Sequence, residues 1–374
     1  MKKRACNVPA LLLVSVLLAG CERPVVTAPP ELATVVSLPE QAIAPVKVKV
    51  VLVTMFEIGA DSGDQAGEFQ LWKERRDLDT VYEFGGHHAL HFESGSGLLV
   101  MVTGIGTAKS AASVTLLGMD PRFDLTEAYW LVAGIAGFDP EDASLGSAAW
   151  AEYLVDGDLA HQIDPREMPA DWQYGYIARH TTTPFQEDRP EPAGEVFQLN
   201  AELTEWAYQL TRDTELPDFP SLQATRDLYT DHPNARRPPF VLKGDNLAAM
   251  TFWHGEILNN WANDWVHYWS DGKGEFVSSA MEDTGTMQAL EYLHAAGRVD
   301  KSRLLVLRTA SNYTMPPPGV TAAVNLFAEN EGYAGLDASL ESAYLVGSMV
   351  IDTLLSNWEI YSQRLPTPED LTRE

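Results

Sequence analysis

Short apolar runs alternate with helix-like stretches along most of this sequence, and the alternation limits the folds open to it. Runs rich in β-branched and aromatic residues cover 47–55, 98–103, 128–134, 148–155, 240–243, 275–280 and 304–309. Stretches with helical character cover 107–118, 200–211, 254–269, 284–296 and 336–362. Strands that are apolar throughout are typical of a sheet buried on both faces, and the intervening helices supply the covering layers. The sequence therefore predicts an α/β fold.

The segment 163–239 breaks this alternation. It contains ten of the 23 prolines in the chain. Proline removes a backbone donor and restricts the backbone, so such a stretch is typical of loops. We therefore expect one domain over 47–362 with a loop-rich insertion at about 163–239, for which a lid is one role to consider. Residues 363–374 contain two further prolines and are expected to form a flexible tail.

The first residues have the composition of an export signal. Three of the first four residues are basic, an apolar run covers 8–18, and small residues lead to Cys21. This order is typical of a secretory signal, here 1–20, and the run is too short to span a bilayer. The string LLAGC that ends at Cys21 resembles a bacterial lipobox, in which the cysteine is lipidated. A plain cleaved signal with an incidental cysteine is the alternative.

Lipidation of Cys21 would account for two further features, the proline-rich segment that follows it and the use of cysteine in the chain. Residues 21–46 contain five prolines, which predicts a semi-rigid linker between lipid and domain. The other cysteine, Cys6, leaves with the signal, so no disulfide is expected in the mature chain. No later segment approaches 18 uninterrupted apolar residues. We therefore expect a lipid-anchored protein of the bacterial cell envelope, facing the periplasm or the outside, with the lipid as its sole membrane contact.

The net charge of −27 disfavours several kinds of partner. The chain has 53 acidic and 26 basic residues. A strongly acidic surface repels phosphate backbones and anionic headgroups, so we expect no binding to nucleic acid. Removal of 1–20 takes away three basic residues and no acidic one, which makes the charge of the mature chain −30. An acidic surface kept for solubility is the simpler explanation of this charge.

Two glycine-rich strings follow strand-like runs. Gly104 and Gly106 belong to GIGTAKS, which opens a helix, and backbone N–H groups at a helix N-terminus can bind anions. The string is not a Walker loop and lacks the third glycine of a dinucleotide fingerprint, so a tight turn is the alternative. Ala136 and Gly137 belong to AGIAGFDP at the end of the next strand. Open α/β sheets bind ligands at such strand ends.

Polar side chains follow two later strands. Glu282 comes after Met281 at the end of a strand, where a carboxylate can accept paired hydrogen bonds from vicinal hydroxyls. Ser311 and Asn312 also end a strand, and an amide can both donate to and accept from one edge of a base. These positions are candidates for sugar and base recognition.

Aromatic and histidine residues give weaker signals. Phe252 and Trp253 offer faces on which a base can stack, with core packing as the alternative. His87, His88 and His91 lie close together, but no helical glutamate and no cysteine accompanies them, so we expect no metal site. No familiar nucleophile signature is present in the sequence.

In this order the strings resemble the nucleoside phosphorylase superfamily, and more closely the purine nucleoside permease family. The strings that carry the resemblance are FEIG from Phe56, GIGTAKSAAS from Gly104, YWLVAGIAGFDP from Tyr129, FWHG from Phe252, MEDTG from Met281 and RTASNY from Arg308. Several rare strings occur in one order from about residue 47 to residue 362. The resemblance implies a nucleoside phosphorylase-like central mixed β-sheet flanked by helices, and a pocket for purine nucleosides.

The same resemblance implies roles for individual residues. By the superfamily pattern, Met281 and Glu282 hold the ribose, while Ser311 and Asn312 lie where the base is recognised. Together with Gly104 and Gly106 in the pocket floor, the expected substrate-binding set includes Ala136, Gly137, Phe252 and Trp253. The candidates for a catalytic role are Glu57 and Asn312. Many members have Asp in place of Asn312 to protonate the leaving purine, which Asn cannot do.

Two functions remain open at this level. The first is purine nucleoside binding and uptake by a membrane-tethered domain. The second is a nucleoside phosphorylase or hydrolase that cleaves the N-glycosidic bond outside the cytoplasm. A phosphorylase would use inorganic phosphate as co-substrate, for which Arg75, Arg76 and Arg308 are candidates by position only; no other cofactor is expected. Superfamily enzymes form oligomers, so a homo-oligomer is compatible with the resemblance.

Overall fold

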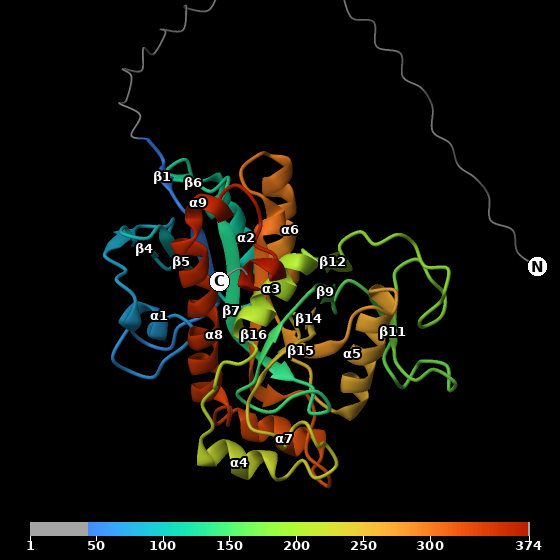
Figure 1. Ribbon diagram of the computed structural model, residues 1–374. Helices are drawn as coiled ribbons and strands as arrows, with labels where there is room; N and C mark the ends of the chain where they lie inside the picture. The colour runs from blue at the N-terminus through green and yellow to red at the C-terminus, as the bar shows by residue number, and fades with distance from the viewer. Residues whose placement is uncertain (1–43, 373–374) are drawn as a thin grey trace, which may run out of the picture. The chain divides into compact units, whose positions relative to one another are not determined.

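The strands of this chain pair into one large mixed sheet with helices on both faces (Figure 1). The computed structural model describes residues 44–372. The expected signal peptide (1–20), the lipidation site Cys21 and the linker as far as residue 43 lie outside the described residues.

Twelve strands of the described part belong to the main sheet. Nine follow in the order β12-β9-β14-β15-β7-β2-β5-β4-β3, while β16 pairs with β7 and β8, and β8 pairs with β13. Their bounds are β2 Val50–Thr54, β3 Thr80–Tyr82, β4 Leu90–Glu93, β5 Leu98–Val102, β7 Tyr129–Phe138, β8 Ala148–Trp150, β9 Tyr153–Asp156, β12 Val196–Gln198, β13 Val241–Lys243, β14 Asp245–Ala248, β15 Phe276–Ala280 and β16 Leu304–Tyr313. Two small pairs are separate: β1 (Val46–Lys47) with β6 (Phe123–Asp124), and β10 (His161–Gln162) with β11 (Tyr176–Ile177).

The centre of the sheet is parallel. β7 lies between β2 and β16 and runs parallel to both, and β5 extends the parallel set beyond β2. The last residues of β7 pair in the antiparallel sense with β15, with Gly137 opposite Ser279. The carboxyl ends of β2, β5, β7 and β16 therefore meet at one edge, where a ligand can contact all four.

Alternate residues of the central strands face opposite cores. Val51 and Val53 of β2 belong to a core shared with α2 and α6, whereas Val50 and Leu52 belong to a core shared with α1, α3 and α8. All four side chains are fully buried. Successive side chains of a strand point to opposite faces, so a strand covered on both sides is apolar throughout. This explains the uninterrupted apolar runs in the sequence.

The helices form the two covering layers seen on either side of the strands in Figure 1. Their bounds are α1 Gln70–Arg75, α2 Thr107–Met119, α3 Ala201–Thr211, α4 Pro220–Arg226, α5 Glu256–Trp269, α6 Asp283–Ala295, α7 Ala322–Glu329, α8 Leu336–Ser356 and α9 Trp358–Tyr361, with 3-10 turns η1 Lys301–Arg303 and η2 Pro368–Thr372. α2 packs against α6, and α8 packs against β7 and β16. α5 adds a third core around Trp261, Trp265 and Trp269.

α8 is long and apolar enough, by length and composition, to cross a membrane. However, 56% of this stretch is buried inside the domain. Val346, Val350 and Leu354 belong to the core on that face of the sheet, so α8 has the surroundings of a core helix.

The predicted α/β fold is confirmed, with differences in detail. The strand predicted over 148–155 is two strands, β8 and β9. Asp245 explains this break, because its carboxylate accepts hydrogen bonds from the backbone N–H groups of Glu152 and Tyr153. The helix predicted over 336–362 ends at Ser356 and continues as the short α9.

The segment 163–239 contains regular elements as well as loops. β12 pairs with β9 at the edge of the sheet, and α3 packs against α8. The Asn200 side chain caps α3 by accepting a hydrogen bond from the Leu203 N–H. The sequence assigns residues 363–374 to a flexible tail. Within this segment Pro368–Thr372 forms η2, which contacts α3, and Arg364 pairs with Asp370 at 2.7 Å.

Candidate functional site

A cavity of about 240 Å³ opens at the carboxyl edge of the parallel strands. Its walls come from the ends of β2, β7, β15 and β16, the loop after β5, and two aromatic side chains from more distant loops. The lining residues are Met55, Phe56, Glu68, Ile105, Ile135, Ala136, Gly137, Phe252, Ser279, Ala280, Met281, Glu282, Ser311, Asn312 and Tyr333. Seven of the residues proposed from the sequence for substrate binding are among them: Ala136, Gly137, Phe252, Met281, Glu282, Ser311 and Asn312.

Glu282 is held in a fixed orientation at the cavity wall. The backbone N–H of Gly106 donates to its Oε1 at 2.9 Å, and Arg308 donates to its Oε2 at 3.2 Å. Burial raises the pKa of Glu282, and the charge of Arg308 opposes this rise. Gly106 adopts a φ of 103°, which a side chain would strain, so glycine is needed where the loop turns its N–H toward the carboxylate.

Gly104 and Gly106 flank the cavity and do not line it. Ile105 between them is the lining residue, and its side chain is 48% exposed. The two glycines therefore shape the loop that presents Ile105 and orients Glu282. The Lys109 side chain folds back against Gly104, because a Cβ built on Gly104 would lie 2.8 Å from Lys109 Cδ.

Arg308 is enclosed by carboxylates and does not line the cavity. Its guanidinium pairs with Asp283 at 2.8 Å and with Glu282 at 3.2 Å, and it also donates to the Ile135 carbonyl. The other two arginines considered for phosphate lie elsewhere: Arg75 pairs with Glu341, and Arg76 pairs with Glu93 and Asp352. None of these arginines points its charge into the cavity as the structure describes it.

Glu68 is a cavity carboxylate that sequence reasoning missed. Its two oxygens accept hydrogen bonds from the backbone N–H groups of Met55 (2.7 Å) and Ile135 (2.8 Å). Burial raises the pKa of Glu68 to about 8, with Glu282 raising it further and Arg308 lowering it. Glu68 is therefore mostly protonated at pH 7, which suits a group that exchanges protons. No strand or helix pattern in the sequence marks this position, because it lies in a loop.

Glu57, the carboxylate proposed from the sequence, lies behind this wall. Its side chain accepts hydrogen bonds from the backbone N–H groups of Ile58, Gly67, Phe69 and Gln70. All these donors belong to the segment between β2 and the start of α1. Glu57 therefore shapes the loop that carries Glu68, and it does not line the cavity.

Two aromatic rings form one side of the cavity. Phe252 and Tyr333 are nearly parallel, with an interplanar angle of 7° and ring centroids 6.3 Å apart. Phe252 is 45% exposed, which leaves its face open for stacking with a base. Trp253 instead packs into the third core against Trp261 and Phe276, which is the alternative considered from the sequence. It borders a small hollow beside the cavity.

Ser311 and Asn312 form a connected polar pair. The Ser311 hydroxyl lies 2.9 Å from Asn312 Oδ1, and Asn312 Nδ2 donates to Glu329 Oε2 at 3.3 Å. Burial raises the pKa of Glu329 to about 7, while its bond to Asn312 lowers it. Both residues line the cavity, and a further carboxyl group, that of Glu329, is bonded to the pair.

A second cavity, of about 540 Å³, has a different character. Its lining contains six carboxylates and several asparagines, including Asp139, Asp142 and Glu275. Only prolines, Met315 and Val320 contribute apolar side chains, and no Phe, Tyr or Trp ring of the described residues lines it. None of the positions proposed from the sequence lies there, so we assign the candidate site to the smaller cavity.

The three histidines lie apart from the cavity. His87 is exposed, whereas His91 is buried at the start of β4. Burial and the nearby Lys73 lower the pKa of His91 to about 4. His88 and His91 approach Asp61, a contact that the sequence does not predict.

Comparison with solved structures supports the fold. The Helicobacter pylori 5′-methylthioadenosine/S-adenosylhomocysteine nucleosidase, solved as a mutant with 5′-methylthioadenosine in the active site, superposes with a TM-score of 0.51 at 15% sequence identity. The match covers 82% of this chain and 99% of that chain. At this identity the likeness shows the fold alone, and it confirms the expected mixed sheet with flanking helices.

Sequence comparison gives the family. The chain is 29% identical to a purine nucleoside permease of Candida albicans over 315 residues, which cover 83% of this chain and 76% of that protein. It is 26% identical to a protein named as a probable purine nucleoside permease of Schizosaccharomyces pombe over 333 residues, covering 84% and 91%. The family model described as purine nucleoside permease (NUP) matches residues 47–366. The chain therefore belongs to the purine nucleoside permease family.

Proposed function

We propose that this domain binds purine nucleosides in the cavity at the carboxyl edge of the sheet and serves their uptake. The observation that carries the proposal is the position of Glu282. Its carboxylate is oriented by Gly106 and Arg308 and lines a cavity that also offers an open aromatic face, Phe252. The relatives named as purine nucleoside permeases support the same ligand class.

The chemistry of the lining fits the two halves of a nucleoside. A carboxylate accepts hydrogen bonds from vicinal ribose hydroxyls, and Glu282 supplies one. The Phe252 and Tyr333 rings offer faces on which a purine stacks, and Asn312 offers both a donor and an acceptor to its edge. The apolar side chains of Ile105, Met281 and their neighbours exclude water from the contact.

Equilibrium binding to the purified full chain tests this proposal. Inosine, guanosine and adenosine are titrated by calorimetry, with uridine as the pyrimidine control. We expect at least one purine nucleoside to bind and Glu282→Gln to weaken that binding at least tenfold. Glu341→Gln, which removes a surface carboxylate, is the matched control and should leave affinity unchanged. If no purine nucleoside binds the wild-type chain, the proposal is lost.

Hydrolysis of the N-glycosidic bond is the second candidate function, and Glu68 is the observation that favours it. A carboxyl group in the cavity wall with a pKa of about 8 can exchange a proton with water or with the leaving base near neutral pH. The described lining contains no Lys or Arg to hold phosphate, so the hydrolytic form is favoured over phosphorolysis.

Release of free purine, with and without phosphate, separates these possibilities. Phosphate-independent release that Glu68→Gln abolishes would establish a hydrolase. Release that requires phosphate would establish phosphorolysis, and Lys109→Ala would then test a cationic side chain that lies against Gly104 of the GIG loop. Binding without release would leave uptake by capture as the function.

We also infer that Cys21 carries a lipid and holds the domain in the cell envelope. The basic start, the short apolar run and the LLAGC string support this assignment. Metabolic labelling with a fatty acid, followed by membrane fractionation, tests it. Cys21→Ser should lose the label and move the protein to the soluble fraction, whereas an unlabelled wild-type chain would contradict the assignment.

A further inference from the structure

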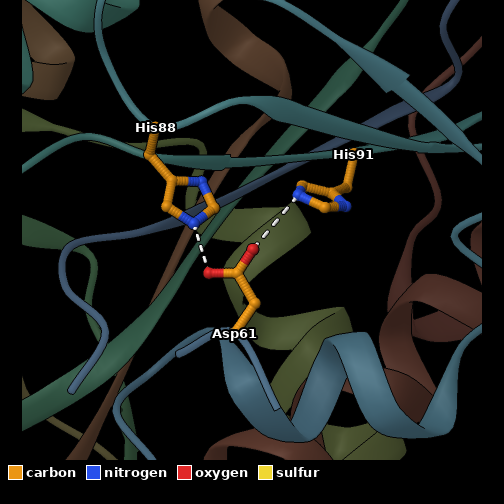
Figure 2. Close-up of side chains that lie close together, drawn as sticks. All are labelled: Asp61, His88 and His91. Atoms are coloured by element: carbon orange, nitrogen blue, oxygen red, sulfur yellow. Dashed lines mark hydrogen bonds and ion pairs between the residues drawn. The ribbon is translucent and has the colours of Figure 1, made fainter. Parts of the chain in front are cut away.

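We propose that Asp61, His88 and His91 bind one divalent transition-metal ion of the zinc class. Their ligand atoms all lie within 4.8 Å of one another, and Figure 2 shows the three side chains directed at a common centre. His88 Nε2 lies 2.8 Å from Asp61 Oδ1, and His91 Nε2 lies 3.6 Å from Asp61 Oδ2. The cluster lies outside the nucleoside cavity, so this proposal does not depend on the proposed function.

The spacing of these atoms is that of neighbouring ligands on one metal. Zinc binds His nitrogen and carboxylate oxygen at about 2.0 to 2.2 Å, which puts two ligands of a tetrahedral site roughly 3.3 to 3.6 Å apart. The 3.6 Å between His91 and Asp61 matches this range. The 2.8 Å between His88 and Asp61 is a hydrogen-bond distance, so these two groups would separate slightly to share a metal ion. Two imidazoles and one carboxylate are also a ligand set that zinc, nickel and cobalt accept, whereas calcium and magnesium prefer oxygen alone.

The hydrogen bonding of His88 points to a cation in this centre. His88 Nδ1 lies 2.9 Å from the Ala89 carbonyl, an acceptor, so Nδ1 carries a ring proton. In a neutral imidazole the lone pair of Nε2 then faces the Asp61 carboxylate at 2.8 Å. Two acceptors at this distance repel each other unless a proton or a metal ion lies between them.

The second imidazole favours a metal over a proton. A single proton on His88 would satisfy its contact with Asp61 but would leave His91 without a close partner. His91 is only 5% exposed, and its Nε2, the nitrogen that faces the cluster, lies 3.6 Å from the Asp61 carboxylate, too far for a hydrogen bond. Burying an imidazole without partners is costly, and one metal ion would engage all three side chains at once.

The surroundings hold the ligands in place and leave a route for the ion. The Phe69 ring packs against both imidazoles, with ring centroids 5.0 Å from His88 and 4.9 Å from His91. The Asp61 side chain is 40% exposed and that of His88 is 23% exposed. The ion can therefore enter from solvent, and a water molecule can supply the fourth ligand.

The position of the cluster indicates a structural role. Asp61 belongs to the loop between β2 and α1, whereas His88 lies in the β3–β4 connection and His91 in β4 itself. The same loop carries Glu68 into the cavity wall. A metal bound here would clip the cavity loop to the edge of the sheet, and it would contact no nucleoside.

Metal titration of the full chain tests the proposal. The chain is purified with a histidine-free tag, stripped with EDTA and titrated with Co²⁺, whose visible absorption reports tetrahedral ligation. We expect one Co²⁺ per chain, displaced by Zn²⁺, and a rise in Tm of roughly 4 °C at a hundredfold excess of Zn²⁺ over its Kd. Asp61→Asn and His91→Gln should each lose the absorption band and the rise in Tm.

His87→Gln is the matched control, because His87 lies in the same turn, is exposed and points to no cluster. It should retain the full signal. Circular dichroism of each variant without metal shows whether the variant folds, and His88→Gln provides a third variant should one of the other two unfold. Unchanged binding in folded Asp61→Asn and His91→Gln, or no Co²⁺ signal in the wild-type chain, would overturn the proposal.

Discussion

At the scale of single residues, Arg308 controls the electrostatics of the cavity wall. The side chain is 1% exposed and pairs with Asp283 and Glu282, which are nearly as buried. Removing one partner of a buried ion pair leaves an uncompensated charge, which costs about 3 to 5 kcal/mol. We therefore expect Arg308→Met to lower the free energy of unfolding by that amount in urea titrations. Arg75→Met, which breaks a partly exposed pair with Glu341, should cost about 1 kcal/mol or less. Equal losses in the two variants would contradict this account.

Glu68 should make stability depend on pH. Its carboxyl ionises near 4.5 in the unfolded chain and near 8 in the folded domain. Between these values the folded state holds the proton more tightly than the unfolded chain does. The stabilisation that protonated Glu68 contributes is therefore complete below pH 4.5 and is lost as pH rises through 8. Between pH 5 and pH 9 the free energy of unfolding of the wild type should fall by on the order of 4 kcal/mol more than that of Glu68→Gln, because Gln cannot ionise.

Chemical denaturation at a series of pH values measures this difference. Glu127→Gln, which removes an exposed carboxylate paired with Lys47, is the control for loss of a surface charge. In Glu127→Gln the free energy of unfolding should depend on pH as steeply as in the wild type. A Glu68→Gln protein with the wild-type slope would show that Glu68 is ionised in the folded domain at neutral pH. Glu282 also has a raised pKa, so a smaller slope of the same sign should remain.

The residues that the sequence could identify are those at strand ends. Glu282 follows β15, and Ser311 and Asn312 lie in the last residues of β16. Because the central strands are parallel, their carboxyl ends meet at one edge. Glu68 and Tyr333 come from irregular connections, whose path depends on side-chain hydrogen bonds such as those of Glu57. No periodicity marks such positions, so the sequence offered Glu57 as the candidate from this loop and gave no signal for Glu68.

At the scale of elements, the contact between the starts of α2 and α6 holds the GIG loop against Glu282. A Cβ on Gly285 of α6 would lie 2.3 Å from the Thr107 carbonyl oxygen of α2, so the two backbones touch. Thr107 Oγ1 donates to the Met281 carbonyl, and the Ser110 and Thr286 hydroxyls are 2.6 Å apart. This contact aligns the Gly106 N–H with the carboxylate.

We therefore expect Gly285→Ala to separate the two helices. Overpacking of this kind costs about 1 to 3 kcal/mol, and a longer distance from the Gly106 N–H to Glu282 should weaken nucleoside binding. Thermal unfolding and nucleoside titration measure the two effects. Gly95→Ala is the control, since an added Cβ there meets no atom within 4 Å. If Gly285→Ala binds nucleoside as tightly as wild type, the helix contact does not position Glu282.

The elements themselves show what local sequence can and cannot predict. The central strands and the helices α2, α5 and α6 were predicted because each buries a continuous apolar run or face. The short strands β3, β4, β12 and β14 were missed, because three or four residues are too few for a clear alternating pattern. In addition, β12 and β14 pair with strands that are distant in the sequence. The turn between β8 and β9 was missed for a similar reason, since the carboxylate of Asp245 creates it.

At the scale of the whole molecule, the acidic charge acts on any ligand that approaches the cavity. The net charge is −27, and the acidic residues of the described lining are Glu68 and Glu282. An uncharged nucleoside meets no repulsion from this field, whereas a nucleotide brings a phosphate with up to two negative charges. The charge that disfavours nucleic acid therefore also predicts selection among small purine ligands.

Inosine and inosine 5′-monophosphate provide the test, because they differ only in the phosphate. We expect the nucleotide to bind at least tenfold more weakly than the nucleoside at 20 mM salt, a gap of about 1.4 kcal/mol. Raising the salt concentration from 20 mM to 400 mM shortens the Debye length from roughly 20 Å to about 5 Å. The difference in affinity between nucleoside and nucleotide should therefore narrow if the repulsion comes from the whole acidic surface. A gap that does not change with salt would assign the selection to the carboxylates of the cavity instead. Equal affinities at low salt would contradict both origins.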